Sequence, residues 1–544
     1  MAKLWRSAVV VPAVIGVCAI LGGIYGPGVT GVAAASSPSS DDDINSSIKT
    51  FASVYDLVER NFADKVSPDK AIYRGAIPGA LHTLDPHSSF FDPRDFQLLR
   101  EDQRGHYYGV GMTVSERSGK TIVIAPFPGS PAYKAGIRPG DAILEVNDKK
   151  TDGLSTTEVA DLLKGPRGTK VQVVVARENT EKPLVFNIIR DEIPRKSVQD
   201  AFWVKPGIAY LDIDSFNENT SHEMEDNLKR LGEQNIKGLV LDLRENPGGL
   251  LNEGVAVADH FLQRNQTIVS HRGRASAERP YVARHGSQGK EYPIVVLVNR
   301  YSASAAEIVS GALQDHDRAW VLGENTFGKG LVQTVYPLNE NTGLALTTAK
   351  YYTPSGRLIQ RDYQHQSFYD YYFHKDLETK NLQDVKMTDS GRTVYGGGGI
   401  SPDEKYEPEK LNRFQIDLTR KFAFFDFIAK YFSNHDTKLQ KGWEPDMAFM
   451  NDFHKYLLDK GFQFTEAEFA ENNTWMKRRL QSEAYITAFS MEESRKFLVE
   501  TDPMVAKAIE AMPKAKALLE NAKKIIVQRM NNSKTAAAAS AEVH

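Results

Sequence analysis

The stretch of sequence that decides the fold runs from Tyr292 to Leu313 and reads YPIVVLVNRYSASAAEIVSGAL. It begins with an apolar run of strand length, Ile294–Val298. After the turn at Ser304, apolar residues recur at helical spacing, at Ala305, Ile308, Val309, Ala312 and Leu313. The pattern predicts a strand, a tight turn and a helix, which together form the repeating unit of an α/β sheet.

Apolar strands alternate with amphipathic helices on both sides of this unit, from Ile193 to about Pro408. This alternation is typical of a largely parallel sheet covered by helices. We therefore expect an α/β core over residues 192–410. Its other clear strands are predicted at Ile208–Ile213, Gly238–Leu243, Trp320–Leu322 and Leu344–Tyr351.

The turn before the predicted helix contains the serines of a Ser-Ala-Ser sequence. A serine at this point lies beside the unpaired N–H groups of a helix start, which favour nearby negative charge. Taken alone, the turn favours Ser302 and Ser304 as simple helix caps. A catalytic role for either serine needs support from another segment.

That support comes from residues 323–333, which read GENTFGKGLVQ. Together with the serine turn, this segment resembles the C-terminal processing, or tail-specific, peptidases. That family has its nucleophile in Ser-Ala-Ser, a base lysine 25 residues later in Phe-Gly-Lys-Gly, and a glutamine four residues further, and this chain has the same spacing. The resemblance implies that Ser304 is the nucleophile, Lys329 the base and Gln333 its orienting partner.

Two more motifs extend the resemblance, which runs from about Asp56 to Arg361. They are Leu-Asp-Pro-His-Ser at 84–88 and Asn-Pro-Gly-Gly at 246–249. An acyl-transfer site also needs two N–H donors for the oxyanion. We expect one from Ala305 at the helix start and the other from the glycine pair, with Gly249 preferred over Gly248.

Lysine acts as a general base only if its pKa, about 10.4 in water, moves toward neutrality. Burial favours this, because a low dielectric disfavours the ammonium form. The sequence neighbours Phe327, Leu331 and Val332 are apolar, and no acidic residue adjoins Lys329 in the chain. A neutral Lys329 would accept the proton of Ser304 and return it to the leaving amine.

Residues 104–191 form a separate predicted unit. Tyr-Gly-Val-Gly-Met at 108–112, with Ser-Pro-Ala at 130–132 and Arg-Pro-Gly-Asp at 138–141, resembles a PDZ domain. A lone Gly-x-Gly would predict only a hairpin turn. The resemblance implies a β-sandwich-like unit with two helices that binds protein or peptide substrates through their free, apolar C-termini. The binding residues would be Gly109, Val110, Gly111 and Met112, with Val110 and Met112 lining the pocket.

The family resemblance also implies that the PDZ domain controls the peptidase. A charged residue in the loop after the PDZ helix would then touch the catalytic region, and Lys164 and Arg167 are the candidates. A solvated basic turn explains the same residues.

Other functions are open at this stage. Gly323 to Lys329 mimics a phosphate-binding loop, but Gly330 stands where magnesium binding needs Ser or Thr. A non-catalytic PDZ scaffold with an inactive peptidase domain is the main alternative. A Ser–His–Asp triad would need His316 or His87 as its base, and His316 lies three helical turns from Ser304. No cofactor and no metal site are expected.

The chain has 544 residues and a formal net charge of −3, so nothing indicates a nucleic-acid binder. Lys3 and Arg6 precede an apolar run at 8–24, and Ala33–Ala35 offers a cleavage site for a signal peptide. An uncleaved inner-membrane anchor is the alternative. Either way the protein is expected to be exported, to the periplasm or another extracytoplasmic space. The single cysteine, Cys18, lies in this leader, so a mature chain has no thiol.

The expected fold is therefore a multidomain mixture of α and β structure. The insert at 362–396 separates two motifs, at 351–357 and 399–403, that are close together in shorter family members. It could cover the active site, bind a partner such as an adaptor protein, or pack on the helical extension that follows residue 411. The extension could equally mediate homo-oligomerisation.

The expected divisions are 1–35 signal peptide or anchor, 36–43 linker, 44–103 helical region, 104–191 PDZ domain, 192–410 peptidase core, 411–530 helical extension and 531–544 disordered tail.

Overall fold

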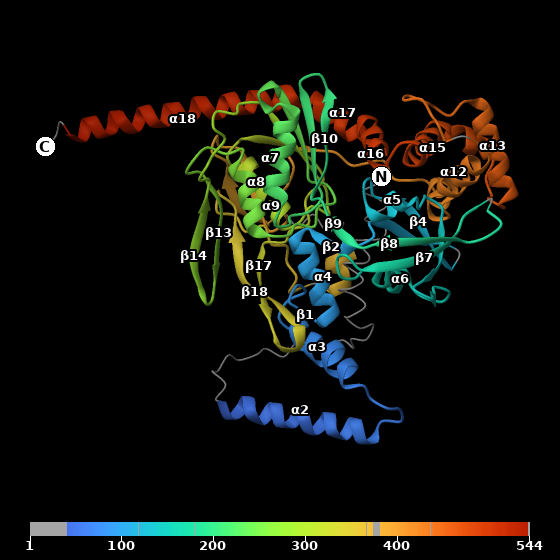
Figure 1. Cartoon of the computed structure of the whole chain (residues 1–544). Coiled ribbons are helices and arrows are strands. Elements are labelled where there is room, and N and C mark those ends of the chain that lie inside the picture. Colours follow the sequence, from blue (N-terminus) through green and yellow to red (C-terminus); the bar gives the residue numbers. More distant parts are fainter. Residues whose placement is uncertain are drawn as a thin grey trace.

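The structure is a computed structural model that describes residues 41–117, 119–178, 180–365, 367–373, 381–435 and 437–541. The predicted leader, residues 1–35, lies outside the described residues, as do the first residues of the predicted linker. Within the described ranges, no helix combines the length and apolar character that crossing a membrane requires. Figure 1 shows the arrangement of the helices and strands.

The peptidase core is built on a six-stranded sheet with the order β10-β11-β12-β15-β16-β21. Only the β10–β11 pair is antiparallel, so the largely parallel sheet predicted from the sequence is confirmed. The inner strands are fully buried, which explains their continuous apolar sequences. The strands are β10 (Val198–Lys205), β11 (Ile208–Ile213), β12 (Gly238–Asp242), β15 (Ile294–Val298), β16 (Ala319–Gly323) and β21 (Glu404–Lys405).

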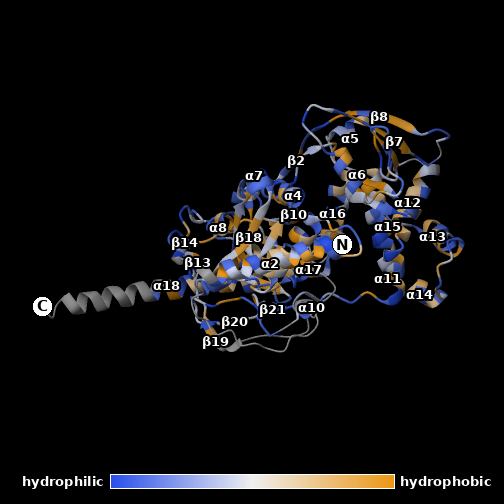
Figure 2. Cartoon of the chain, turned by 90° about the horizontal axis from the view of Figure 1, so that it is seen from below, coloured by the Kyte–Doolittle hydropathy of each residue, from blue (hydrophilic) through white to orange (hydrophobic). Residues whose placement is uncertain are grey.

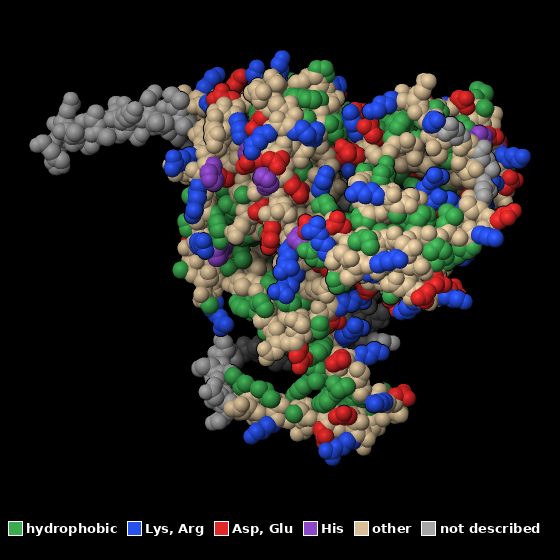
Figure 3. Space-filling model, in the orientation of Figure 1, with side chains coloured by type: hydrophobic (Ala, Val, Ile, Leu, Met, Phe, Trp, Pro, Cys, Tyr) green, Lys and Arg blue, Asp and Glu red, His purple; other side chains and the backbone are tan. Residues whose placement is uncertain are grey.

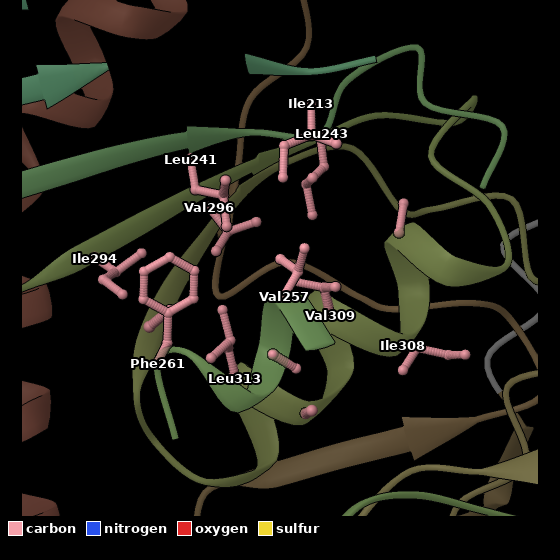
Figure 4. Packing of buried hydrophobic residues seen from close by; sticks show 14 of the residues in the cluster. Ile213, Leu241, Leu243, Val257, Phe261, Ile294, Val296, Ile308, Val309 and Leu313 are labelled. Carbon is pink, nitrogen blue, oxygen red and sulfur yellow. The ribbon is translucent and has the colours of Figure 1, made fainter. Parts of the chain in front are cut away.

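Helices cover both faces of this sheet. One face packs against α7 (Thr220–Leu231), α8 (Leu251–Asp259) and α9 (Ala305–Asp315). Figure 4 shows this packing, in which Leu241 and Val296 of the sheet face the apolar sides of the helices. The opposite face packs against α17 (Pro503–Glu510) and α18 (Met512–Ala541).

A second, antiparallel sheet lies beside the core. Its strand β18 pairs with both β1 and β17, and β17 begins two residues after Lys329. This sheet therefore fixes the position of the lysine segment and of the glutamine that follows it. Its strands are β1 (Ser89–Phe91), β13 (Thr267–Gly273), β14 (Ser276–Val282), β17 (Leu331–Pro337) and β18 (Gly343–Tyr352).

The unit predicted as a PDZ domain forms its own sheet, in the order β3-β4-β5-β7-β8, with β6 paired to β5. Strand β3 is an edge strand, and helix α6 packs beside it. A short pair, β2 with β9, closes the unit where the chain enters and leaves it. The elements are β2 (His106–Gly109), β3 (Met112–Arg117), β4 (Lys120–Pro126), α5 (Pro131–Ala135), β5 (Ala142–Val146), β6 (Lys149–Lys150), α6 (Thr156–Leu163), β7 (Lys170–Ala176), β8 (Leu184–Ile189) and β9 (Asp191–Pro194).

The N-terminal region is mostly helical and contains α2 (Asp41–Asn61), a π-helix η1 (Asp69–Ala76), α3 (Ile77–His82) and α4 (Pro93–Arg104). The prediction that the linker reaches residue 43 is wrong, because α2 already begins at Asp41. Acidic residues are favourable in the first turn of a helix. Helix α2 lies at the bottom of Figure 3, and its Ile48, Phe51 and Leu57 are exposed.

The C-terminal extension is helical, as predicted, and its first part has an aromatic core of its own. This part lies on the same side of the peptidase core as the PDZ-like unit (Figure 2). Helix α18 runs toward the other side (Figure 1). The guanidinium carbon of Arg117 in β3 lies 3.0 Å from the ring centre of Phe422. This contact joins the PDZ-like unit to the extension. The helices are α11 (Arg413–Arg420), α12 (Ala423–Asn434), α13 (Met447–Asp459), α14 (Glu466–Glu471), α15 (Asn473–Ala488) and α16 (Met491–Glu500), followed by α17 and α18.

The prediction of a disordered tail from residue 531 is wrong for most of that segment. Helix α18 continues to Ala541. The tail sequence contains a run of alanines, and alanine has the highest helix propensity of all residues. The insert at 362–396 folds into α10 (Phe368–Phe373) and a hairpin of β19 (Asn381–Met387) and β20 (Thr393–Gly396).

Candidate active site

Ser304 lies in the turn between β15 and α9, where the sequence predicts a strand-to-helix change. Its backbone has φ 54° and ψ −113°, a conformation that few residues other than glycine adopt. Such strained positions cluster at functional sites, because the surrounding structure must hold them in place. A simple helix cap would have extended backbone angles instead. The turn therefore resembles a nucleophile elbow, which exposes a serine at the end of a strand.

The side chain of Glu307 holds this turn against the lysine segment. Its Oε2 accepts the backbone N–H of Ser304 at 2.9 Å and that of Lys329 at 2.8 Å. Its Oε1 accepts the backbone N–H of Gly328 at 2.8 Å and the hydroxyl of Thr326. Burial raises the pKa of Glu307, while these hydrogen bonds act in the opposite direction. One buried carboxylate thus links the two segments that carry the predicted nucleophile and base.

A second shared contact comes from Tyr351 of β18, which is almost fully buried. Its hydroxyl lies 3.1 Å from the carbonyl oxygen of Ser304 and 2.5 Å from that of Lys329. The backbone N–H of Tyr351 also donates to the carbonyl of Gly330 at 2.9 Å. The structure therefore brings together Ser304 and Lys329 through contacts on both their N–H and C=O groups.

The predicted partner Gln333 lies on β17, close to the side chain of Lys329. The Nζ of Lys329 donates to Oε1 of Gln333 at 2.8 Å. The amide of Gln333 in turn donates through Nε2 to the backbone carbonyl of His87. Because Nε2 is used in this way, the oxygen of the amide must face the lysine. Gln333 is therefore oriented to hold the Lys329 amine.

The glycine pair of the Asn-Pro-Gly-Gly motif lies against the serine turn. A Cβ on Gly248 would lie 2.7 Å from Cβ of Ser304 and 3.0 Å from the backbone nitrogen of Ala305. The N–H of Gly248 already donates to Oδ1 of Asn246 at 2.7 Å. The N–H of Gly249 donates to no other residue in the described part of the chain. This geometry favours Gly249 over Gly248 as an oxyanion donor, beside Ala305 at the helix start.

The other serine of the turn has a structural position. The hydroxyl of Ser302 donates to the carbonyl of Leu243 at 2.7 Å and accepts the N–H of Asn299 at 3.0 Å. Ser302 is fully buried and ties the turn to the end of β12. Its place in these bonds leaves Ser304, and not Ser302, as the candidate nucleophile.

The two histidines considered as alternative bases have other partners. His316 contacts Asp389 and the carbonyl of Thr267, each at 2.7 Å, at the far end of α9. His87 contacts Tyr371 of α10 at 2.9 Å. Burial and the nearby charges of Lys329 and Arg361 hold the pKa of His87 well below its usual range.

The insert reaches the site through this histidine. The hydroxyl of Tyr372 donates to the carbonyl of Pro86 at 3.0 Å, and Tyr371 packs edge-on to Phe327, two residues before Lys329. The sequence did not indicate which role the insert has. Its helix α10 packs beside the lysine segment, on the residues that hold Gln333 in place.

The predicted peptide-binding turn joins β2 to the edge strand β3. Gly111 has φ 78°, and a Cβ there would lie 2.5 Å from Cβ of Ser130, so no other residue fits. Val110 and Met112 are buried in the core of the unit. Both predicted regulatory residues pair with acidic side chains. Lys164 pairs with Glu101 of α4 at 2.7 Å, and Arg167 pairs with Asp191 at 2.8 Å on the surface.

Comparison with known proteins places these features in a family. A profile of peptidase family S41 matches residues 207–365, which include every residue of the candidate catalytic set. A carboxy-terminal-processing protease of Bartonella bacilliformis is 40% identical over 315 residues, which cover 57% of this chain and 72% of that protein. The chain belongs to the carboxy-terminal processing proteases of peptidase family S41. It is a serine-type peptidase.

A second curated relative agrees with this assignment. The carboxy-terminal processing protease CtpA of Bacillus subtilis is 31% identical over 416 residues, which cover 72% of this chain and 88% of that protein. A solved photosystem II D1 C-terminal processing protease is 29% identical, with a TM-score of 0.33, and the match covers 67% of this chain and 93% of that one. A PDZ profile matches residues 122–177, which confirms the domain but begins after the turn at Gly109–Met112.

Proposed function

We propose that this protease cleaves exported proteins with a Ser304–Lys329 pair and selects them by their C-terminal tails. Ser304 Oγ attacks the scissile carbonyl carbon while the neutral amine of Lys329 accepts the hydroxyl proton. Lys329 then gives that proton to the leaving amine as the C–N bond breaks. Water, deprotonated by the same lysine, hydrolyses the acyl-enzyme and restores Ser304.

The oxyanion of each tetrahedral intermediate would accept hydrogen bonds from the N–H groups of Ala305 and Gly249. Such fixed donors act on charge that develops only in the transition state. Gln333 would hold the lysine amine, since its own amide is fixed by the carbonyl of His87.

One observation supports this proposal more than any other. The backbone N–H groups of Ser304 and Lys329, which are 25 residues apart, both donate to the same oxygen of Glu307. A non-catalytic PDZ scaffold would not need a strained serine backbone held against a lysine. No observation favours that alternative.

The PDZ domain would supply the choice of substrate. A peptide can add to the edge strand β3, while the backbone N–H groups of Gly109–Met112 bind its terminal carboxylate. The buried side chains of Val110 and Met112 make the surroundings of this turn apolar. Tails that end in apolar residues should therefore bind better than acidic ones.

Location and partners complete the proposal. The sequence of residues 1–35 supports a signal peptide, or an anchor through 8–24, and therefore export to the periplasm or another extracytoplasmic space. The insert and the helical extension are the segments that would bind an adaptor protein or a second copy. The domain divisions given by the sequence, with α2 beginning at Asp41 and α18 continuing to Ala541, serve as the proposed boundaries. Lys164 and Arg167 remain the proposed residues through which the PDZ domain controls the peptidase.

A competition assay tests tail selection. An unstructured substrate with an apolar C-terminus is offered with its tail either free or amidated, and the expected rate for the free tail is about tenfold or more higher, because a charge-assisted set of hydrogen bonds contributes roughly 1.5–3 kcal/mol. Gly111→Ala should remove this difference by lowering the rate for the free tail only. Gly129→Ala is the matched control, because Gly129 has the same φ of 78° but open space around it. Equal rates in the unmutated protease would contradict tail selection.

A further inference from the structure

The helical extension contacts the loop that leads to the oxyanion glycines. Asp502 is the N-cap residue of helix α17, and its Oδ1 accepts the backbone N–H of Met504 at 2.8 Å. Its other oxygen, Oδ2, forms an ion pair with Nη1 of Arg244 at 2.9 Å. The side chain of Arg244 is only 16% exposed, so this pair is largely shielded from water.

Arg244 is fixed from its other side by the end of β12. Its Nη2 lies 2.7 Å from Oδ2 of Asp242, and its backbone N–H donates to Oδ1 of the same residue at 2.9 Å. Asp242 is fully buried and also accepts the hydroxyl of Tyr210 at 2.7 Å. Five residues after Arg244 the chain reaches Gly249. The guanidinium therefore joins the extension, the sheet and the start of the oxyanion loop.

The same turn of α17 also reaches the segment that leads to Lys329. A Cβ on Gly323, the last residue of β16, would lie 2.7 Å from Cε of Met504. Both loops of the candidate site thus leave the sheet directly beside the start of α17. The carboxylate remains charged there: burial opposes ionisation, but the Arg244 guanidinium holds the pKa of Asp502 below its usual range.

We propose that Asp502 is a positioning residue of the peptidase, and that its ion pair with Arg244 holds the oxyanion loop in the geometry that catalysis needs. This inference rests on the proposed role of Gly249. It gives the helical extension, which contributes none of the proposed catalytic residues, a part in the reaction. If the oxyanion loop is displaced by a fraction of an ångström, the protease still binds substrate but stabilises the transition state less.

The test separates the charge of Asp502 from its role as a helix cap. Asparagine caps helices as well as aspartate does, so Asp502→Asn removes the charge and keeps the cap. We expect kcat to fall about tenfold, with KM changed less than twofold. The inhibition constant of a peptide aldehyde, whose adduct with a serine carries the same oxyanion, should weaken by a similar factor.

Two controls distinguish positioning from general stability. Val505→Ala shortens a buried side chain on the same helix and should lower Tm while kcat is unchanged. Lys514→Met breaks the surface pair of the extension with Glu404 and should change neither quantity. If Asp502→Asn does not fold, Asp502→Ser, which also caps a helix, takes its place in every comparison.

The outcomes are distinct. Unchanged kcat and aldehyde binding in Asp502→Asn would overturn the inference. It would also be overturned if Val505→Ala lowers kcat as much as Asp502→Asn does when the two variants lose the same amount of Tm. Ser304→Ala is assayed alongside. If it is inactive while Asp502→Asn is fully active, only the positioning role fails. If Ser304→Ala is active, the proposed catalytic mechanism fails.

Discussion

Glu307 accepts the backbone N–H of Lys329 at 2.8 Å, across 22 residues of sequence, and holds the predicted base against the turn of the predicted nucleophile. The carboxylate is completely buried and has donors on both of its oxygens. An acid in this position helps to set the geometry of the site without contacting the reacting atoms.

Replacing Glu307 by glutamine should therefore reduce activity strongly. An amide has only one acceptor oxygen, so its NH₂ group would face either the N–H groups of Ser304 and Lys329 or that of Gly328. A buried donor left unsatisfied costs about 1–3 kcal/mol, and we expect kcat to fall about 5- to 150-fold with a smaller change in KM. Ser310→Ala, which removes a buried hydroxyl from the same helix, should lower Tm but leave kcat intact. Full activity of Glu307→Gln would show that the carboxylate has no part in positioning.

The role of Lys329 as the general base predicts both the effect of an arginine substitution and the pH dependence of activity. Arginine cannot deprotonate in a protein, so Lys329→Arg should be as inactive as Lys329→Ala although it keeps the charge. In the unmutated protease, kcat/KM should rise with pH between about 6 and 9, because only the neutral amine accepts a proton. The measurement is initial rates over this range with one unstructured substrate. A flat profile, or an active arginine variant, would exclude Lys329 as the titrating base.

His87 should make stability depend on pH. Its pKa in the folded state is held well below the usual 6.5, so the unfolded chain binds this proton first as the pH falls. The folded state should therefore lose stability below about pH 6.5, by up to about 1.4 kcal/mol per pH unit from this residue. In His87→Gln this contribution is absent. Denaturant unfolding of both proteins at pH 7.5 and 5.5 should show a smaller loss for the variant, and equal losses would contradict the account.

Much of the fold could be predicted from local pattern. Strands β11 and β15 have the predicted bounds, because each is a short apolar run. The serine turn and the lysine segment could be paired only through the family spacing. The hydrophobic periodicity alone predicts Ser304 to be a helix cap.

Other parts of the site could not be predicted. The sequence showed no acidic residue adjoining Lys329, yet Glu307 reaches its backbone N–H from another helix. The contact of His87 with Tyr371 joins residues 284 positions apart, and no local pattern encodes such a distance. The same holds for the ion pair of Arg244 with Asp502. These contacts depend on how the sheets and the extension pack, which becomes visible only in three dimensions.

The most direct test of the Ser304–Lys329 pair is a double-mutant comparison of kcat/KM. Ser304→Ala, Lys329→Ala and the double variant are measured with one substrate, and their folding is checked by Tm. Residues that act as one unit are not additive, so the double variant should be no less active than either single variant, with all three near the uncatalysed rate. Substantial activity in either single variant, or losses that multiply in the double variant, would contradict a shared catalytic role.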